Sequence, residues 1–432
     1  MAGKKRQLSR MLLECQNNDK LCVIQENQAE LIIVPVLLVG VFVIVLGIIL
    51  WLHHQNLRLK QQTSPESKEE APVTMSKKAK TQESISTPEH TSIQLSETTM
   101  DCLLRTAAFT LKELEIPREK ICLESVEFIQ NGSFGGIYRA ELRTNIPGKT
   151  QPVILKALQD AASSHELKDF LEKIEFYQFL GSHANIVKLL GCCTNQMPLY
   201  MVLEDASNGN LLNFLWTCRK DIVTMDGLPF DLTERQVYKI GQQIASALEF
   251  LEQKKLFHGD VAARNILIGR EVTVKLCRLG LAYRRHTSGP SSIMAQTVPL
   301  KWQAPEQLLK KSRDIKSDIW SFGIFLYEMI TLGAPPFPEV PPAEILQYHQ
   351  RRHIMKRPSS CNPTMYNMMK ACWHWAPTDR PSPTKLIGQL QTAIKTSNDQ
   401  AVLQVPELVM PELYAVVAGI DIRDLAIDYT VF

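Results

Sequence analysis

The sequence predicts an α+β protein with a β-rich region, a mainly helical region after it and a single membrane-spanning helix ahead of both. Three observations support this prediction. Short apolar runs separated by turns occupy residues 121–204. Helical spacing of apolar residues marks 211–216 and, more clearly, 234–253. An apolar run at 31–52 contains no charged residue.

The composition is that of an ordinary globular protein and points to no nucleic-acid partner. The 432 residues have room for two or three domain-sized units, and 45% hydrophobic with 22% charged residues is a usual balance. The net charge of +3 is small for this length, so it supports neither nucleic-acid binding nor a strongly acidic partner. The ten cysteines include no C-x-x-C pair, which disfavours a zinc site.

Residues 31–52 predict a transmembrane helix that contacts the lipid bilayer. These 22 residues are long enough to cross roughly 30 Å of hydrocarbon. A cleaved signal peptide is the alternative, but the run begins late and is followed by His53 and His54 rather than by a small-residue cleavage site. Gly40 and Gly47 share one helix face, which leaves a homo-oligomer through residues 31–52 as an open option.

The charges that flank this run favour an N-terminus outside the cytosol. The preceding side has one nearby cation, Lys20, and four acids, whereas the following side has three cations between 58 and 68. A basic cluster at 4–10 favours the opposite orientation. We expect residues 1–30 to be a short extracellular or lumenal segment and the remainder to be cytoplasmic, at the plasma membrane or an endosomal membrane.

Residues 53–114 predict a disordered juxtamembrane linker. The stretch 53–100 has 14 Ser or Thr among 48 residues, balanced charges and no apolar periodicity. From Leu103 to Leu114 the spacing fits an amphipathic turn or two that lead into the folded domain.

The β-rich region contains elements suited to an anionic ligand. I-Q-N-G-S-F-G-G-I-Y at 129–138 lies between two strand-like runs, and a glycine-rich hairpin there lets backbone N–H groups approach phosphates. V-I-L-K at 153–156 places Lys156 at the end of an apolar strand, where an ammonium group needs an anion. The elements that follow are a helix at 169–180 and strands at 185–191 and 199–204.

The order of these elements, together with later motifs, resembles a protein kinase. H-G-D-V-A-A-R-N at 258–265 is similar to the catalytic loop of that family in its tyrosine-kinase form. P-L-K-W at 299–302 resembles the segment that positions a tyrosine substrate. Further landmarks are A-P-E at 304–306, D-I-W-S-F-G at 318–323, C-W at 372–373 and R-P at 380–381. The resemblance implies that Arg380 pairs with Glu306 in a structural role. The resemblance spans about residues 121–395 and is close to receptor tyrosine kinases of the fibroblast-growth-factor-receptor type.

This resemblance implies a two-lobed protein-kinase fold over residues 115–395. The small β-rich lobe would occupy about 121–205 and the large helical lobe about 206–395, followed by a C-terminal tail at 396–432. The resemblance also implies ATP and Mg²⁺ as cofactors. It implies protein substrates or signalling adaptors as partners, in growth-promoting signalling.

The catalytic residues implied by the resemblance are Lys156, Asp260 and Asn265. Lys156 would hold the α- and β-phosphates, Asp260 would accept or orient the proton of the substrate hydroxyl, and Asn265 would hold a metal. Leu203 would be the gatekeeper, followed by the hinge. The implied nucleotide contacts are Ile129, Gln130, Asn131, Gly132, Ser133, Phe134, Gly135, Ile137, Lys156, Leu203, Glu204 and Ala206.

Two acidic positions of the family are basic in this chain. Arg278, in R-L-G, replaces the aspartate that holds the metal bridging the phosphates, and a guanidinium cannot coordinate magnesium. Lys173 replaces the helix glutamate that pairs with the strand lysine, with Glu172 and Glu175 beside it as candidate substitutes. The site is therefore four charge units more positive than the family norm, from two lost negative charges and two gained positive ones. Arg278 either contacts nucleotide phosphates directly or pairs with one of these two acids and keeps the cleft shut.

Two further departures concern the loops around the site. Gln130 replaces the first glycine of the hairpin, where a side chain crowds the phosphates or stiffens the flap. Gly259 replaces the arginine that grips a phosphorylated activation loop. That loop, roughly 281–298, has one tyrosine, Tyr283 at its start, so activation by loop-tyrosine phosphorylation is not expected.

Two functions follow from these residues. One is a tyrosine kinase of weak or impaired activity. The other is a catalytically dead pseudokinase, a scaffold that docks signalling partners at a membrane. In the tail, Tyr414 and Tyr429 are candidates for phosphorylation and recognition by adaptors, and Y-T-V-F at 429–432 also fits an endocytic sorting signal. Packing of the aromatic tail on the large lobe is the third option.

Overall fold

A computed structural model describes Gly47, Trp51 and residues 100–205, 209–219, 230–288, 298–311, 313–405 and 409–420. The predicted transmembrane segment 31–52 lies outside these residues except for Gly47 and Trp51, and most of the predicted linker lies outside them too. Within the described residues, no helix combines the length and apolar character needed to span a bilayer. The chain divides into two compact units, 1–85 and 86–432, and the elements below belong to the second.

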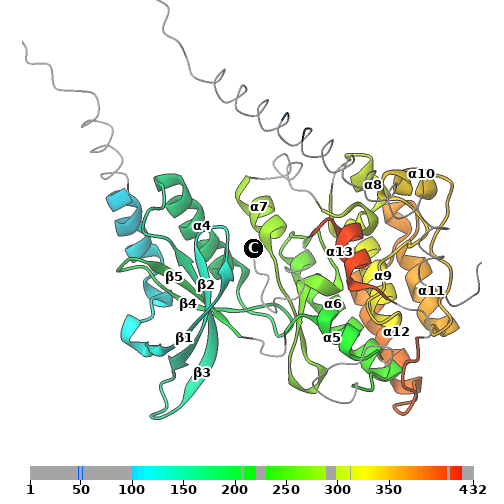
Figure 1. Cartoon of the computed structure of the whole chain (residues 1–432), viewed down its shortest axis with the longest axis horizontal. Coiled ribbons are helices and arrows are strands. Elements are labelled where there is room, and N and C mark those ends of the chain that lie inside the picture. The colour runs from blue at the N-terminus through cyan, green and yellow to red at the C-terminus, as the bar shows by residue number, and fades with distance from the viewer. Residues whose placement is uncertain are drawn as a thin grey trace, which may run out of the picture. The chain divides into compact units, whose positions relative to one another are not determined.

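The small lobe is a five-stranded antiparallel sheet with one long helix beside it (Figure 1). The strands are β1 (Ile121–Asn131), β2 (Gly136–Arg143), β3 (Thr150–Leu158), β4 (Leu189–Cys193) and β5 (Leu199–Glu204), in the order β1-β2-β3-β5-β4. The helix, α4 (Ser164–Leu180), begins at a capping box formed by Ser163 and Glu166. Its buried face, which includes Phe170 and Ile174, shares the apolar core with Ile154 of β3. This packing brings Lys156 and Lys173 to one small pocket.

The end of the predicted linker is part of the folded domain. Residues 100–110 are helical and lead into a short 3-10 helix at Lys112–Leu114. Ala107 and Leu111 are 3% and 0% exposed and join the core of the small lobe. The amphipathic turns predicted from Leu103 to Leu114 are therefore helical and pack on the small lobe.

The large lobe is mainly helical, as predicted. Its elements are α5 (Leu211–Thr217), α6 (Glu234–Gln253), β6 (Ile266–Ile268), β7 (Val274–Leu276), α7 (Gly280–Ser288), α8 (Pro305–Leu308), α9 (Ile315–Ile330), α10 (Ile345–Gln350), α11 (Pro363–Cys372), α12 (Pro383–Thr396) and α13 (Pro411–Ala418). The helices predicted at 211–216 and 234–253 are confirmed as α5 and α6. Every residue of α9 from Ser317 to Ile330 is buried, so this helix lies at the centre of the lobe.

Two buried acids hold parts of the large lobe together, and one of them, Asp318, holds the predicted catalytic loop. Glu306 forms a bidentate ion pair with Arg380, at 2.7 and 2.8 Å. Asp318 accepts hydrogen bonds from the backbone N–H groups of His258 (2.6 Å) and Gly259 (2.7 Å). The pairing of Arg380 with Glu306 that the motifs imply is confirmed.

The segment after R-L-G begins as a helix rather than as a loop. The Tyr283 hydroxyl of α7 donates to Asp169 Oδ1 of α4 at 2.6 Å, and His286 stacks on Phe179 with ring centres 4.2 Å apart. The predicted loop at 281–298 is thus helical to Ser288, because α4 supplies partners for one face of α7; residues 289–297 lie outside the described residues.

The backbone conformation and the packing at position 259 favour glycine over the arginine that the family has there. The φ of Gly259 is +86°, a region that favours glycine, and a Cβ atom there would lie 2.5 Å from Leu281 Cδ1 of α7. Leu281 is itself buried against Phe257 and Val298. A side chain at 259 is therefore incompatible with α7 in this position.

The C-terminal tail is docked on the large lobe. After α12, the backbone N–H of Leu403 donates to the carbonyl of Leu232, and Arg235 pairs with Asp399 at 3.5 Å. In α13, Tyr414 is completely buried. Packing of the tail on the large lobe is confirmed for Tyr414, whereas Tyr429 lies outside the described residues.

Candidate phosphate-transfer site

The predicted catalytic loop holds Asp260 between two side chains of the same loop. Arg264 Nη2 pairs with Asp260 Oδ1, and Asn265 Nδ2 donates to Asp260 Oδ2 at 2.8 Å. Below the loop, Glu328 of α9 accepts a hydrogen bond from the Ala263 backbone at 2.9 Å. The Asp260 side chain remains 20% exposed, so its carboxylate is fixed and open to the cleft.

The metal position does not fit the magnesium that the family uses. Asn265 Oδ1 is buried and has no hydrogen-bond partner among the described residues, which suits a cation ligand. However, the second ligand position holds Arg278, whose backbone is left-handed with φ +61°. Across the described ranges, no group of three His, Cys, Asp or Glu residues could hold a metal. One amide oxygen, with an arginine at the second predicted ligand position, leaves magnesium without the anionic ligand that it needs.

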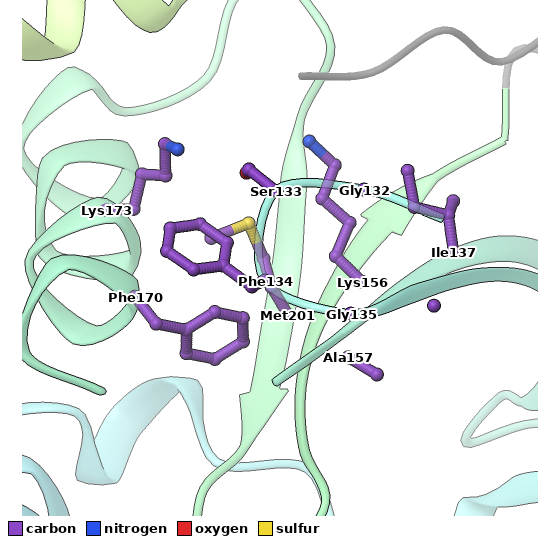
Figure 2. A pocket seen from close by; sticks show the side chains of 11 residues that line it. Gly132, Ser133, Phe134, Gly135, Ile137, Lys156, Ala157, Phe170, Lys173 and Met201 are labelled. Atoms are coloured by element: carbon purple, nitrogen blue, oxygen red, sulfur yellow. The ribbon is translucent and has the colours of Figure 1, made fainter. Parts of the chain in front are cut away.

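Lys156 lines the small pocket beneath the glycine-rich hairpin (Figure 2). It lies in register with Ile137 and Met201 on the neighbouring strands. Within the described part of the chain it forms no ion pair or hydrogen bond. Burial, and then the positive charges of Lys173 and Arg278, lower the pKa of Lys156 to about 7. An anion entering this space would restore its proton.

The two acids beside Lys173 point to other partners. Glu172 accepts a hydrogen bond from the Tyr283 hydroxyl at 3.3 Å, and Glu175 accepts one from a threonine hydroxyl of the preceding helix at 3.3 Å. Neither acid substitutes for the lost glutamate opposite Lys156 in this structure, because α4 presents Lys173 to the cleft.

Lys173 is held by aromatic rings. Its ammonium nitrogen lies 4.4 Å from the ring centre of Phe134 and 5.5 Å from that of Tyr283. Burial lowers the pKa of Lys173, and nearby Asp169 partly opposes that shift. Two ammonium groups thus border the region where phosphates bind in the family.

The glycine-rich hairpin is closed over this region (Figure 2). Phe134 packs edge-on against Phe170 of α4, with ring centres 5.4 Å apart, and its carbonyl accepts a hydrogen bond from Gln159. Gly135 has φ +154°, and a Cβ atom there would lie 2.9 Å from the carbonyl of Ala157, so glycine permits this close approach. The cavity beneath the hairpin is about 10 Å³, room for a water molecule rather than a triphosphate.

The predicted adenine contacts are also packed together. Ile137 and Leu203 are each 1% exposed and belong to one apolar core. Glu204, at the start of the hinge, pairs with Lys275 at 2.9 Å, and Ala206 lies outside the described residues. The remaining predicted contacts lie on the hairpin, with Ile129, Gln130 and Asn131 at the end of β1 and Gly132 and Ser133 in its turn.

Over residues 123–390 the chain matches the family described as protein tyrosine and serine/threonine kinase. The chain belongs to this protein kinase family. Two relatives are both named tyrosine-protein kinase STYK1. The human protein is 55% identical over 426 residues, which cover 98% of this chain and 99% of the relative. The mouse protein is 54% identical over 430 residues, which cover 99% of this chain and 100% of the relative. Fibroblast growth factor receptor 1 of Xenopus laevis is 33% identical over 316 residues, which cover 69% of this chain and 37% of the receptor.

A wider cleft of this kinase domain, of about 1020 Å³, lies in front of the catalytic loop. Asp260, Lys173 and Arg278 line it together with 298–300, the start of the segment predicted to position a tyrosine. Tail residues 416–420 line the same space. The predicted base, the cations and the tail therefore share one cleft.

Sequence reasoning missed three features of this kinase site. Arg264 was recognised only as part of a motif, although its spacing of four residues from Asp260 is a usable signal for an ion pair. The packing of Phe134, a predicted nucleotide contact, against Phe170 and Lys173 has no signal in the hairpin sequence. No sequence signal places Tyr414 beside Arg264, because 150 residues separate the two.

Proposed function

We propose that the chain is a membrane-anchored tyrosine kinase of weak activity, which transfers phosphate from ATP to protein tyrosine in growth-promoting signalling. The observation that carries this proposal is that the cleft keeps the predicted catalytic base but has cations at two positions where the family has acids. Asp260 is fixed and exposed, whereas Lys173 and Arg278 stand where the family has acids. The names of the human and mouse relatives support tyrosine as the acceptor.

Anchoring in the membrane rests on residues 31–52 and their flanking charges. In this proposal residues 1–30 are extracellular or lumenal and the kinase domain is cytoplasmic, where ATP is available. A homo-oligomer through 31–52 is compatible with Gly40 and Gly47 on one face. Protease treatment of sealed membrane vesicles tests the orientation: loss of the kinase domain from vesicles with an exposed cytoplasmic face is expected, and its protection contradicts the proposal.

Asp260 would accept the proton of the tyrosine hydroxyl as that oxygen attacks the terminal phosphate. Arg264 and Asn265 keep its carboxylate in place, so the proton moves to a fixed oxygen atom. The hydroxyl would enter through the cleft lined by 298–300. In the family, magnesium draws charge from the phosphate oxygens; because the residues at this site do not fit magnesium, no step is assigned to it.

Lys156, Lys173 and Arg278 would instead meet the phosphate charge directly. Ammonium and guanidinium groups neutralise phosphate oxygens, and the phosphates would in turn keep Lys156 protonated. These cations do not bridge the β- and γ-oxygens as a metal does, so alignment of the transferred group is poorer. The expected result is nucleotide binding with slow transfer.

The test is phosphate transfer to a tyrosine peptide by the purified full chain. Slow transfer that is lost in Asp260→Asn supports the proposal, whereas transfer that survives this substitution comes from a contaminating kinase. Restoring both acids, Lys173→Glu with Arg278→Asp, is expected to raise the magnesium-dependent rate about a hundredfold. Lys168→Glu with Arg284→Asp is the matched control, because it makes the same charge change at the exposed rim of the cleft.

A pseudokinase scaffold is the second candidate, and the closed hairpin favours it. Phe134 fills the space that phosphates need, and the cavity left there is about 10 Å³. Phe134→Ala removes this obstacle. A scaffold predicts no transfer by the wild type, by this variant or by the chain with both acids restored, while partner binding is kept.

A further inference from the structure

The tail places a tyrosine in a closed socket beneath the predicted catalytic loop. The Tyr414 ring packs edge-on against Trp302 and Trp216, with ring centres 5.3 and 5.9 Å apart. Its hydroxyl donates to Glu328 Oε1 at 2.5 Å and accepts a hydrogen bond from Arg264 Nη1 at 3.4 Å. We call these four residues, Trp216, Arg264, Trp302 and Glu328, the tyrosine socket. The Tyr414 hydroxyl therefore has a partner both as a donor and as an acceptor.

The socket is connected to the base of the predicted reaction. Arg264 contacts Tyr414 through one guanidinium nitrogen and Asp260 through the other. Glu328 holds the loop backbone at Ala263. Trp302 belongs to the short helix Leu300–Trp302, the segment predicted to position a substrate tyrosine. The residues that hold a tyrosine in the socket therefore also hold the catalytic loop and the segment that would position an acceptor tyrosine.

The path of the tail holds Tyr414 at this place. Arg235, beside the start of α6, contacts Ser397 and Asp399, and Val409 is buried just before α13. On α13 the buried face is made by Tyr414, Ala415 and Ala418. The end of α13 and the two residues after it, 416–420, line the cleft that Asp260 also lines. Docking of the tail thus narrows this cleft from one side.

We propose that the tyrosine socket is a binding site for an unmodified tyrosine, that its ligand is the chain's own Tyr414, and that docking and phosphorylation of Tyr414 exclude each other. The phenol is completely buried with its oxygen against the Glu328 carboxylate. A phosphate dianion there would add negative charge beside that carboxylate in a space with no exit to water. Burial and Glu328 also raise the pKa of Tyr414 well above its usual value, which keeps the phenol a neutral donor.

A tyrosine kinase acting on the tail must therefore capture it in the released state. The γ-phosphoryl group of ATP passes to the Tyr414 oxygen, ADP leaves and the phenol proton is lost. The phosphorylated tail stays out of the socket, which opens the cleft near Asp260 and presents the stretch around Tyr414 to a phosphotyrosine-reading partner. Docking itself does not depend on the weak kinase activity proposed above.

Hydrogen exchange of α13 in the full chain tests the docking. Tyr414→Phe keeps the ring and removes both hydrogen bonds, so amides of 412–418 should exchange about tenfold faster, the loss expected for a hydrogen bond to a charged group. Tyr414→Ala should speed exchange further, while Leu413→Ala, at an exposed neighbour on the same helix, should leave it unchanged. Exchange in α12 reports that the lobe stays folded. Equal exchange of α13 in wild type and both Tyr414 variants overturns the proposal.

Phosphorylation by an added tyrosine kinase tests the exclusion. In the Asp260→Asn full chain, which removes self-modification, Tyr414 should be phosphorylated at least about tenfold more slowly than in a free peptide of residues 409–420. The phosphorylated chain should lose protection of α13. Equal rates in chain and peptide, or a protected α13 after phosphorylation, would each overturn the exclusion.

Discussion

Two charged clusters of the kinase domain are built in opposite ways. In the large lobe, Glu306 and Arg380 form a buried bidentate pair, and Asp318 accepts two backbone hydrogen bonds. On the nucleotide side, Lys156 and Lys173 lie close enough for their charges to oppose each other, and Lys156 has no ionic partner within the described residues. In the first cluster each acid has a hydrogen-bond or ionic partner. In the second cluster the positive charges call for an anionic ligand.

This difference distinguishes the residues that hold the fold together from those predicted to act on ATP. Asp318 holds the catalytic loop, and the pair of Glu306 with Arg380 holds other parts of the large lobe, so the scaffold has a defined shape. The charges that would face Mg²⁺ and ATP are changed in sign at two positions. A complete kinase scaffold therefore does not imply complete kinase chemistry, and the two clusters should respond differently to substitution.

The largest expected effect is in the scaffold. Arg380→Ala leaves Glu306 buried beside Ser317 without its cation, which should lower the free energy of unfolding by about 3–5 kcal/mol. Arg105→Ala is the matched control, because its pair with Asp101 is 83% and 69% exposed and should contribute little. Chemical denaturation of both variants measures the contrast, and similar losses would show that the buried pair has no special role.

A smaller effect is expected where the scaffold meets α7. Gly259→Ala adds a Cβ atom against Leu281, so it should cost about 2–4 kcal/mol from backbone strain and overpacking together. Gly148→Ala also introduces a side chain at positive φ, +74°, but meets nothing within 4 Å, so it should cost about 1 kcal/mol. The difference in unfolding free energy between the two variants isolates the clash with α7; equal costs would mean that α7 does not exclude side chains at 259.

The third expected effect is spread over several pH units and concerns the charge of Lys156. Its pKa is lowered from 10.5 to about 7 in the folded chain, so between these values the unfolded chain holds a proton that the folded chain has released. The free energy of unfolding should therefore rise with pH in this window, by at most about 1.4 kcal/mol per pH unit. Lys156→Met removes this contribution. If wild type and variant show the same pH dependence from neutral to alkaline pH, Lys156 has an ordinary pKa.

The sequence was sufficient for the parts of the fold that rest on local patterns and spaced motifs. The periodicity of 211–216 and 234–253 predicted α5 and α6, and the A-P-E and R-P landmarks predicted the pair of Glu306 with Arg380. Such features are predictable because each is encoded by residue types at fixed positions. The exchange of acids for bases at 173 and 278 is a prediction from the resemblance alone.

The arrangement of side chains in the cleft was not predictable in the same way. Phe134 turns toward α4 because Phe170 and Lys173 offer it an aromatic and a cationic partner, and neither contact is visible in the hairpin sequence. The helix α7 forms because α4 supplies its partners. Tyr414 is buried through contacts with residues more than 80 positions away. Tertiary packing, rather than local preference, decides each of these features.

The central claim is that cationic side chains of the protein replace the metal in neutralising the phosphate charge of ATP. Binding of ATP to the full chain with and without magnesium tests this claim most directly. Titration calorimetry below pH 7, where Lys156 is protonated, gives the affinity in Mg²⁺ and in a chelator. We expect ATP to bind as tightly or more tightly in the chelator, because magnesium would compete with Lys156, Lys173 and Arg278 for the phosphate oxygens. Lys173→Glu with Arg278→Asp should reverse that preference. Binding that requires magnesium in the wild type would contradict the account.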